Sequence, residues 1–379
     1  MIAYLDNAAT TRVWPEVAQA AAEAMTEGYF NPSSRYPEAT KAAKALESHR
    51  STVAKALGCS PKEVFFTSCG TESDNWAIRC GAEYGRRKGK HIITTAIEHH
   101  AVLEPVRALE RQGYEVTYLK PNAQGTIDLK ELEQALREDT ILVSMMLVNN
   151  ELGTLLPVKE AAQLIRRSGA PALIHCDAVQ AFLKVPFTPK ELGVDLLSVS
   201  GHKIHAPKGI GALYLRNGLK LPPLLLGGGQ ESGLRSGTEP TAQIAAFAKA
   251  CALGLQRRDA DIAHMQQLKE YTLSRIAREV PQVTPVVLGE APHVLALTME
   301  GYKSEVLVRV LGDRGVCVSA GSACHRGKPS HVYAALELSK PRRDGAFRVS
   351  FCGDTTQEEV DQLIDGLAFA ARTLFPSMS

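Results

Sequence analysis

Short apolar runs alternate with helical patterns between about residues 60 and 215, and this alternation constrains the fold of the 379-residue chain more than any other feature. Helical patterns cover residues 71–84, 128–137 and 158–167. The apolar runs have the length of strands and read EVFFT, HIITT, EVTYL, TILVSMMLV, ALIHCD, DLLSVS and GALYL. The alternation predicts an α/β fold with a mostly parallel central sheet. In such sheets ligands bind at the carboxyl ends of the strands.

The chain changes character after this region. Residues 221–238, LPPLLLGGGQESGLRSGT, contain too many glycines for an ordinary helix or strand. A long helical pattern then extends to about Glu279, and the remainder alternates strands and helices as a smaller α+β unit. We therefore predict a large domain of residues 13–255 and a small domain of residues 1–12 and 256–379. No low-complexity linker separates the two, so we expect them to pack closely.

Composition argues against several classes of protein. A net charge of +2 gives no strong attraction to nucleic acid or to an acidic membrane, and no apolar run is long enough to span a bilayer. The start, MIAYLDNAATT, lacks the basic and apolar regions of a signal peptide. Eight cysteines without a CxxC pair argue against a disulfide framework or a structural zinc site. We expect a cytoplasmic protein that holds no metal.

Polar residues follow several of the predicted strands. Lys203 stands in SGHK directly after one strand, Asp177 stands in HCDAVQ after another, and small residues in TSCGTESDN open a helix at Thr71. Backbone N–H groups at a helix N-terminus suit a phosphate. A lysine, a carboxylate and a phosphate site together form the layout that pyridoxal 5'-phosphate (PLP) requires. Each motif is weak by itself, and a surface lysine on an ordinary α/β fold remains an open interpretation of these residues.

Together the motifs carry a family resemblance that extends over nearly the whole chain. In order, they are YLDNAATT, NPSS, FTSCGTESDNWAI, EHHAV, VNNELGT, HCDAVQ, SGHKIHAPKGIGALY, GGGQESGLRSGT, SAGSAC and RVSF. Their order and rough spacing resemble those of the cysteine desulfurases, which are fold-type I PLP enzymes of the class V aminotransferase group. The resemblance implies a homodimer, an L-cysteine substrate and a protein that accepts sulfur for iron–sulfur cluster or thio-cofactor synthesis.

The resemblance also assigns roles to individual residues. Lys203 matches the lysine that forms the Schiff base and shuttles protons, and Asp177 matches the partner of the pyridine nitrogen. His99 matches the histidine that stacks on the ring, where it is expected to assist protonation steps as a catalytic residue, with its neighbour His100 as a less favoured alternative. The other matches are Gln180 at the phenolic oxygen, Gly70 (through its backbone), Thr71, Ser200 and His202 at the phosphate, Thr238 at the phosphate of the partner subunit, Asn150 near the ring and substrate, and Arg348 at the substrate carboxylate.

Structural roles remain open for the same side chains taken singly. His99 or His175 can be a histidine satisfied within the core, which is the commoner situation for a lone histidine. Arg348 can belong to a structural ion pair, and Asp177 can cap the turn that follows its strand. Only the joint pattern favours function over these alternatives.

Cys324 differs from the other seven cysteines, which lie in or beside predicted regular elements where a thiol is usually inert. It ends the small, flexible sequence SAGSAC, and His325, Arg326 and Lys328 follow it. Nearby cations stabilise a thiolate, which is the reactive form of cysteine. The resemblance agrees, because Cys324 aligns with the cysteine that takes up sulfur as a persulfide and leaves alanine as the product.

The segment after Cys324 departs from the family pattern. Only HRGK separates Cys324 from Pro329. This is about two residues fewer than in relatives with an SAGSAC or SSGSAC loop, and each extended residue supplies about 3.3–3.6 Å of reach. We hypothesise slower or more selective delivery of sulfur to the acceptor.

Three other functions are compatible with these residues. A selenocysteine lyase acts on a substrate that differs from cysteine by one chalcogen atom. Another class V aminotransferase or lyase would use the same PLP site with Cys324 as an incidental thiol. A non-catalytic sulfur-trafficking scaffold is disfavoured, because a scaffold has no need of Lys203, Asp177 and Arg348.

Overall fold

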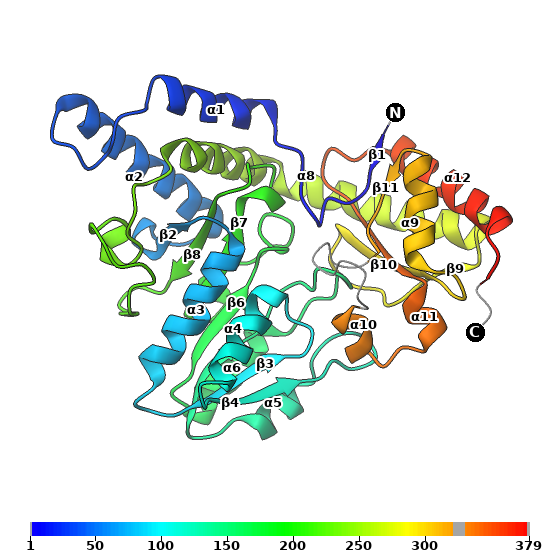
Figure 1. The fold of residues 1–379 in the computed structure, drawn as a ribbon, viewed down its shortest axis with the longest axis horizontal. Coiled ribbons are helices and arrows are strands. Elements are labelled where there is room, and N and C mark those ends of the chain that lie inside the picture. The colour runs from blue at the N-terminus through cyan, green and yellow to red at the C-terminus, as the bar shows by residue number, and fades with distance from the viewer. Residues whose placement is uncertain (1, 321–329, 377–379) are drawn as a thin grey trace.

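A computed structural model describes residues 2–320 and 330–376 of the chain. Its largest element is a seven-stranded sheet with the strand order β2-β8-β7-β6-β5-β3-β4 (Figure 1). Within this sheet only β8 runs antiparallel to its neighbours, so the predicted mostly parallel α/β sheet is confirmed. The strands are β2 (Val64–Thr67), β3 (His91–Thr95), β4 (Glu115–Leu119), β5 (Thr140–Ser144), β6 (Leu173–Asp177), β7 (Leu196–Ser200) and β8 (Gly211–Leu215).

Helices cover both faces of this sheet. One apolar cluster joins the sheet to α3 (Gly70–Gly85) and α4 (His100–Glu110), and a second joins its other face to α2 (Pro37–Leu57), α6 (Val158–Ser168) and α8 (Thr241–Glu279). The remaining helices of this part are α1 (Pro15–Thr26), α5 (Leu129–Ala135) and α7 (Pro189–Leu192), with 3₁₀ turns at Pro61–Glu63, Gly201–Lys203 and Glu231–Gly233. No helix within residues 2–320 or 330–376 is both long and apolar enough to cross a membrane.

A second, smaller unit has its own sheets and its own apolar core. β1 (Ala3–Tyr4) pairs with β11 (Val316–Cys317), and β10 (Val294–Met299) lies between β9 (Val283–Pro285) and β12 (Ala346–Ser350). α8 extends from the large sheet to this unit (Figure 1), and the domain boundary predicted at residue 255 falls inside that helix and stays a prediction. The other helices here are α9 (Ser304–Asp313), α11 (Lys340–Asp344) and α12 (Gln357–Thr373), whereas α10 (His331–Ala335) buries Val332 and Tyr333 in the apolar cluster of the large sheet.

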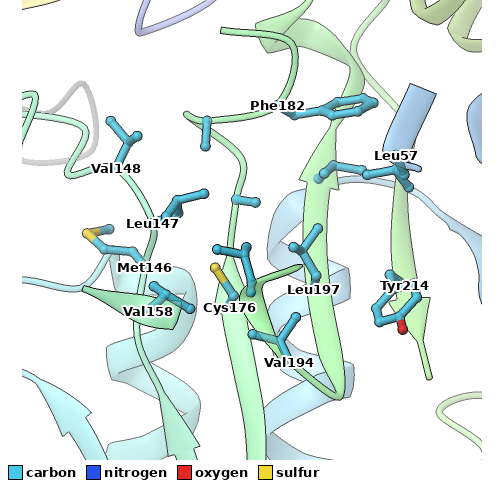
Figure 2. Packing of buried hydrophobic residues seen from close by; sticks show 14 of the residues in the cluster. Leu57, Met146, Leu147, Val148, Val158, Cys176, Phe182, Val194, Leu197 and Tyr214 are labelled. Carbon is cyan, nitrogen blue, oxygen red and sulfur yellow. The ribbon is translucent and has the colours of Figure 1, made fainter. Parts of the chain in front are cut away.

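The central strands are buried on both faces, so their residues alternate between the two apolar clusters. Figure 2 shows the cluster on the face away from α3, which contains Cys176, Leu197 and Phe182. The face toward α3 is apolar in the first part of the central strands, at Leu142, Leu173 and Leu196. Two residues later the same face becomes polar, at the fully buried Ser144, His175 and Ser198. Because buried polar groups are costly, this change marks the carboxyl ends of β5, β6 and β7 as a functional region.

Candidate active site

A cavity of about 230 Å³ lies at the carboxyl ends of β5, β6 and β7. Strand and helix ends bring its residues together: β6 ends in Asp177, β7 leads into the turn that carries Lys203, and β12 of the smaller unit contributes Arg348. All predicted site residues except Thr238 and Cys324 line it, namely Gly70, Thr71, His99, Asn150, Asp177, Gln180, Ser200, His202, Lys203 and Arg348.

The N-terminus of α3 has the properties of an anion site. α3 begins at Gly70, and the side chain of the residue before it, Cys69, does not cap it. A Cβ at Gly70 would lie 2.8 Å from Cγ2 of Val179, so only glycine keeps this approach open. The hydroxyl of Ser200 is buried and has no hydrogen-bond partner among the described residues. An orphaned hydroxyl beside a helix N-terminus fits the phosphate of PLP.

His202 also lines this cavity, and its imidazole is neutral. Burial and the positive charges of Lys203, Lys184 and Lys208 lower the pKa of His202 to about 3. Its Nδ1 lies 3.2 Å from the hydroxyl oxygen of Thr10. A bound phosphate would therefore meet a hydrogen-bonding group here.

Backbone carbonyls of the N-terminal segment hold the amine of Lys203. Its Nζ donates hydrogen bonds to the carbonyl oxygens of Ala8 at 2.6 Å and of Ala9 at 2.8 Å. The side-chain amide of Gln180 also donates to Ala8, at 2.9 Å, and its buried Oε1 has no partner in the described part of the chain. The amine thus reaches the cavity in a fixed position, as a lysine that bonds to PLP requires.

Asp177 lies among buried polar groups. Burial, followed by the charge of Asp74, raises the pKa of Asp177 to about 7. One oxygen of Asp177 accepts from the backbone N–H of Val179 at 2.9 Å, so it also caps the turn after β6. A protonated pyridine nitrogen is a cation that would relieve this buried carboxylate. The capping role and the proposed cofactor role are therefore compatible.

His175 is a satisfied core histidine, as one interpretation of the sequence held. Its Nδ1 lies 2.8 Å from Ser144 Oγ, and its Nε2 lies 3.0 Å from Ser198 Oγ and 3.5 Å from Asp74 Oδ1. Burial lowers the pKa of His175 to about 4, so the ring is neutral. Its function is to satisfy the polar ends of three strands beneath Asp177.

The structure places His99, and not His100, on the wall of the cavity. His99 caps the N-terminus of α4, where its Nδ1 accepts from the backbone N–H of Ala101 at 3.1 Å. Because Nδ1 is an acceptor, the neutral ring carries its proton on Nε2. The ring of His100 instead lies 4.8 Å from that of His331, and its Nδ1 lies 3.7 Å from Glu104.

Arg348 is almost fully buried and carries two contacts. Its Nη2 donates to Asp6 Oδ1 at 2.8 Å, and its Nη1 donates to the backbone oxygen of Asn150 at 2.7 Å. Its Nε is buried without a partner in the described residues. The structural ion pair considered from the sequence therefore exists, and it leaves donor capacity for a ligand carboxylate.

Sequence reasoning missed the part played by the N-terminal segment. Asp6 holds Arg348, Ala8 and Ala9 accept from Lys203, and Thr10 contacts His202. The motif YLDNAATT supported the family resemblance, but backbone carbonyls leave no side-chain signature. One signal in the sequence could have indicated this role: the family motif YLDNAATT stands at the start of the chain, far in sequence from the other site residues.

Two predicted residues are not placed in the cavity. Thr238 is exposed and does not line it, and Cys324 lies outside the described residues. Of the described cysteines, Cys69 lines the cavity. Burial raises the pKa of five others and makes them poor nucleophiles, namely Cys59, Cys80, Cys176, Cys251 and Cys352.

Among the described residues, His205, Cys352 and Asp354 bring potential metal ligands within 4.8 Å of one another. All three of these side chains already have protein partners, and Cys352 Sγ accepts from the hydroxyl of Thr355 at 3.6 Å. His205 Nδ1 contacts the backbone oxygen of Arg12 at 2.9 Å, and Asp354 accepts from Trp14 Nε1 at 2.6 Å. These contacts account for the group as a polar network, and we assign no metal to it.

Comparisons with known proteins agree with this geometry. The sequence model of the family described as "Aminotransferase class-V" matches residues 3–363. A cysteine desulfurase of Trichormus azollae is 42% identical over 368 residues, which cover 96% of this chain and 91% of the relative. A solved structure of a "NIFS-LIKE PROTEIN" has a TM-score of 0.93 and 37% identity, covering 99% of this chain and 100% of its own. The solved structure of "SspA in complex with cysteine" has a TM-score of 0.80 and 34% identity, covering 93% and 99%.

The chain therefore belongs to the class V aminotransferase family of enzymes. Within that family it is a member of the cysteine desulfurase group, which the near-complete coverage of relatives at about 40% identity establishes. The predicted family and the predicted fold of a PLP-dependent transferase are both confirmed.

Proposed function

We propose that this protein uses PLP to convert L-cysteine to L-alanine and retains the sulfur as a persulfide on Cys324. The single observation that supports this best is the convergence of Lys203, Asp177 and Arg348 on one cavity from two strands and the turn that follows a third. A lysine, a buried carboxylate and a buried arginine have no common structural purpose at this place. They match the needs of an amino acid substrate and a pyridine cofactor.

The residues present fit PLP. Asp177 would hold the pyridine nitrogen, Gln180 the phenolic oxygen, and Gly70, Thr71, Ser200 and His202 the phosphate, with the ring beside His99. When bound, PLP withdraws electrons from the substrate carbon skeleton and so stabilises a carbanion. Asn150 lines the same cavity and would lie near the ring and the substrate.

The chain's own groups perform the remaining tasks. Arg348 binds the substrate carboxylate and orients the substrate. Lys203 Nζ removes the proton from the substrate Cα and returns it later. The Cys324 thiolate attacks the substrate sulfur: the new S–S bond forms, the C–S bond breaks, and its electron pair stays on Cβ, which is then protonated. The net change is L-cysteine plus thiol to L-alanine plus persulfide.

The persulfide requires an acceptor. A thiol of an acceptor protein takes the outer sulfur and restores the Cys324 thiol, which supplies iron–sulfur cluster or thio-cofactor synthesis. The similar structure of "SspA in complex with cysteine" supports cysteine as the kind of substrate. The seven described cysteines are free thiols, which agrees with a reducing compartment such as the cytoplasm.

We also propose a homodimer in which Thr238 reaches the phosphate site of the partner subunit. Thr238 is exposed on the glycine-rich segment, away from the cavity of its own chain. The same segment exposes two adjacent apolar side chains, Leu225 to 44% and Leu226 to 87%, and such contiguous apolar surface supports a contact with a partner subunit.

The test measures alanine and sulfide from L-cysteine and a reductant, with purified PLP-loaded protein. Wild type is expected to form both, and Cys324→Ala to lose at least about 100-fold in rate while its PLP absorbance is unchanged. Cys59→Ala, remote from the cavity, is the matched control and keeps full activity. Loss in Cys69→Ala but not in Cys324→Ala would move the persulfide to Cys69. A fully active Cys324→Ala would favour another class V reaction.

A further inference from the structure

The N-terminal segment brings a carboxylate to the arginine that faces the substrate. Asp6 Oδ1 lies 2.8 Å from Nη2 of Arg348. The side chain of Arg348 is 2% exposed and that of Asp6 is 21% exposed, so the pair lies at the border between the core and the cavity. Screening by water is weak at such a place, and the charge of Asp6 acts on Arg348 at short range.

The position of Asp6 is fixed by its neighbours in the chain. The hydroxyl of Tyr4 donates to the backbone oxygens of Asp6 and Thr10, at 3.3 and 2.7 Å. The backbone N–H of Ala8 donates to Ser350 Oγ at 2.9 Å, and Asp6 forms a β-bridge with Ser350. The carboxylate is therefore part of a rigid frame that also includes the strand of Arg348.

Two of the three guanidinium nitrogens of Arg348 have hydrogen-bond partners in the described residues, and the third has none. Nη1 is bonded to the backbone oxygen of Asn150 and Nη2 to Asp6. Nε, which shares one edge of the guanidinium with Nη2, has no partner in the described residues. A substrate carboxylate can therefore bond to Arg348 while Asp6 stays in place, and two carboxylates then share one positive charge.

We propose that Asp6 is a positioning residue that holds Arg348 in its binding orientation and at the same time lowers the affinity of the site for the α-carboxylate of the amino acid. This inference rests on the proposed role of Arg348 in the proposed function. The hydrogen bond orders the guanidinium before the substrate arrives. The negative charge opposes a second carboxylate, so that both L-cysteine and the product L-alanine bind less tightly and L-alanine leaves more readily.

The two effects are separable with two substitutions. Asp6→Asn keeps the shape and an acceptor oxygen but removes the charge, so its comparison with wild type measures the charge. Asp6→Ala removes both, so its comparison with Asp6→Asn measures the hydrogen bond. Asp259→Asn removes an aspartate whose side chain is 84% exposed and serves as the matched control.

The probe is L-alanine, titrated into the PLP-loaded proteins while the absorbance of PLP is followed. Asp6→Asn is expected to bind L-alanine about three- to tenfold more tightly than wild type, with a matching fall in the KM for L-cysteine and no rise in kcat. Asp6→Ala is expected to bind L-alanine at least about threefold more weakly than Asp6→Asn. Asp259→Asn behaves as wild type.

If Asp6→Asn binds L-alanine as tightly as wild type or more weakly, the charge of Asp6 does not lower the affinity for the α-carboxylate, and this part of the proposal is overturned. Equal affinities of Asp6→Ala and Asp6→Asn overturn the positioning role. Unfolding midpoints and PLP content show that each variant is intact, and Asp6→Asn tests the charge even if Asp6→Ala does not fold. Failure to form sulfide defeats the proposed function but leaves the L-alanine titration valid. If L-alanine does not change the PLP absorbance of wild type or of Asp6→Asn, the inference about Asp6 is overturned.

Discussion

Buried carboxylates dominate the electrostatics beneath the cavity. Asp74, Glu98 and Asp177 are almost completely buried, and burial raises the pKa of each. His175, whose ring lies close to Asp74, is neutral because burial lowers its pKa to about 4. Ionising these buried acids therefore lowers the stability of the cofactor-free protein. The same negative charge favours the binding of a cationic ring, so these acids increase the affinity for the cofactor at the expense of folding stability.

Asp177→Asn is predicted to stabilise the cofactor-free protein at pH 8. The pKa of Asp177 is about 7 when folded and 3.8 when unfolded, so the folded state binds its proton more tightly. Stability from this group is present below the unfolded pKa and is lost as the pH rises through about 7. The gain of the asparagine variant is on the order of 2–4 kcal/mol at pH 8 and smaller, about 1–2 kcal/mol, at pH 5, where the folded aspartate is neutral but the unfolded one is ionised.

Urea unfolding of the cofactor-free proteins at pH 5 and pH 8 measures this difference. Asp259→Asn is the control and should show no gain at either pH. The same Asp177→Asn protein should bind PLP more weakly, because a neutral amide does not compensate a pyridinium. Equal stability of wild type and Asp177→Asn at pH 8 would show that the charge of Asp177 is not costly in the empty site.

At the scale of elements, the strands and the polar residues at their ends could be predicted because both are properties of side chains. An apolar run followed by HCD or SGHK carries the information for a strand and its functional end. The wall formed by residues 6–10 could not be predicted in the same way. Ala8 and Ala9 act through carbonyl oxygens, which every residue has, and only the fold brings them to Lys203. Asp74 was missed because an aspartate in a helical pattern normally faces water.

Ser330 caps the N-terminus of α10 and joins this helix to Glu151, so its substitution tests what holds α10 in place. Its Oγ accepts from the backbone N–H groups of Val332 and Tyr333 and donates to Glu151 Oε2 at 2.6 Å. Ser330→Ala removes the cap and one donor to a buried carboxylate, and is expected to cost about 2–4 kcal/mol of unfolding free energy. Ser339 stands at the N-terminus of α11, where its side chain forms no capping bond, so Ser339→Ala should change stability by less than about 0.5 kcal/mol. Similar urea midpoints for the two variants would contradict the argument.

The 3₁₀ turn at Glu231–Gly233 is fixed by a buried ion pair. Arg50 donates to both oxygens of Glu231 at 2.7 and 2.8 Å, and the backbone N–H of Phe66 adds a third bond at 2.8 Å. Arg50→Ala leaves the charge of Glu231 buried and is expected to cost about 3–5 kcal/mol. Arg137, which pairs with Glu115 at the surface, is the control, and Arg137→Ala should cost no more than about 1 kcal/mol. Calorimetry would contradict this if both variants lost equal stability.

At the scale of the whole molecule, the site exists only where the two units meet. Lys203 and Asp177 belong to the seven-stranded sheet and the turn that follows it, and Arg348 belongs to the three-stranded sheet of the smaller unit. The N-terminal segment contacts both, because β1 pairs with β11 of the smaller unit while Ala8 and Ala9 bond to Lys203. Displacement of either unit would separate the carboxylate-binding group from the amine, so the relative placement of the two sheets sets the distance over which a substrate must fit.

The proposed homodimer adds a second level of assembly, and mixed dimers test it directly. If Thr238 serves the partner's phosphate site, each site takes Lys203 from one chain and Thr238 from the other. Lys203→Ala then inactivates the site of its own chain. Thr238→Asp inactivates the site of the partner chain, because a carboxylate repels phosphate. A mixed dimer then contains one site with both defects and one site with neither. Co-expression at random should restore about a quarter of the wild-type activity, although each variant alone is inactive at limiting PLP. The readout is alanine formation by the mixed population, with each variant alone as the control. No restoration would place Thr238 in the site of its own chain or outside any site.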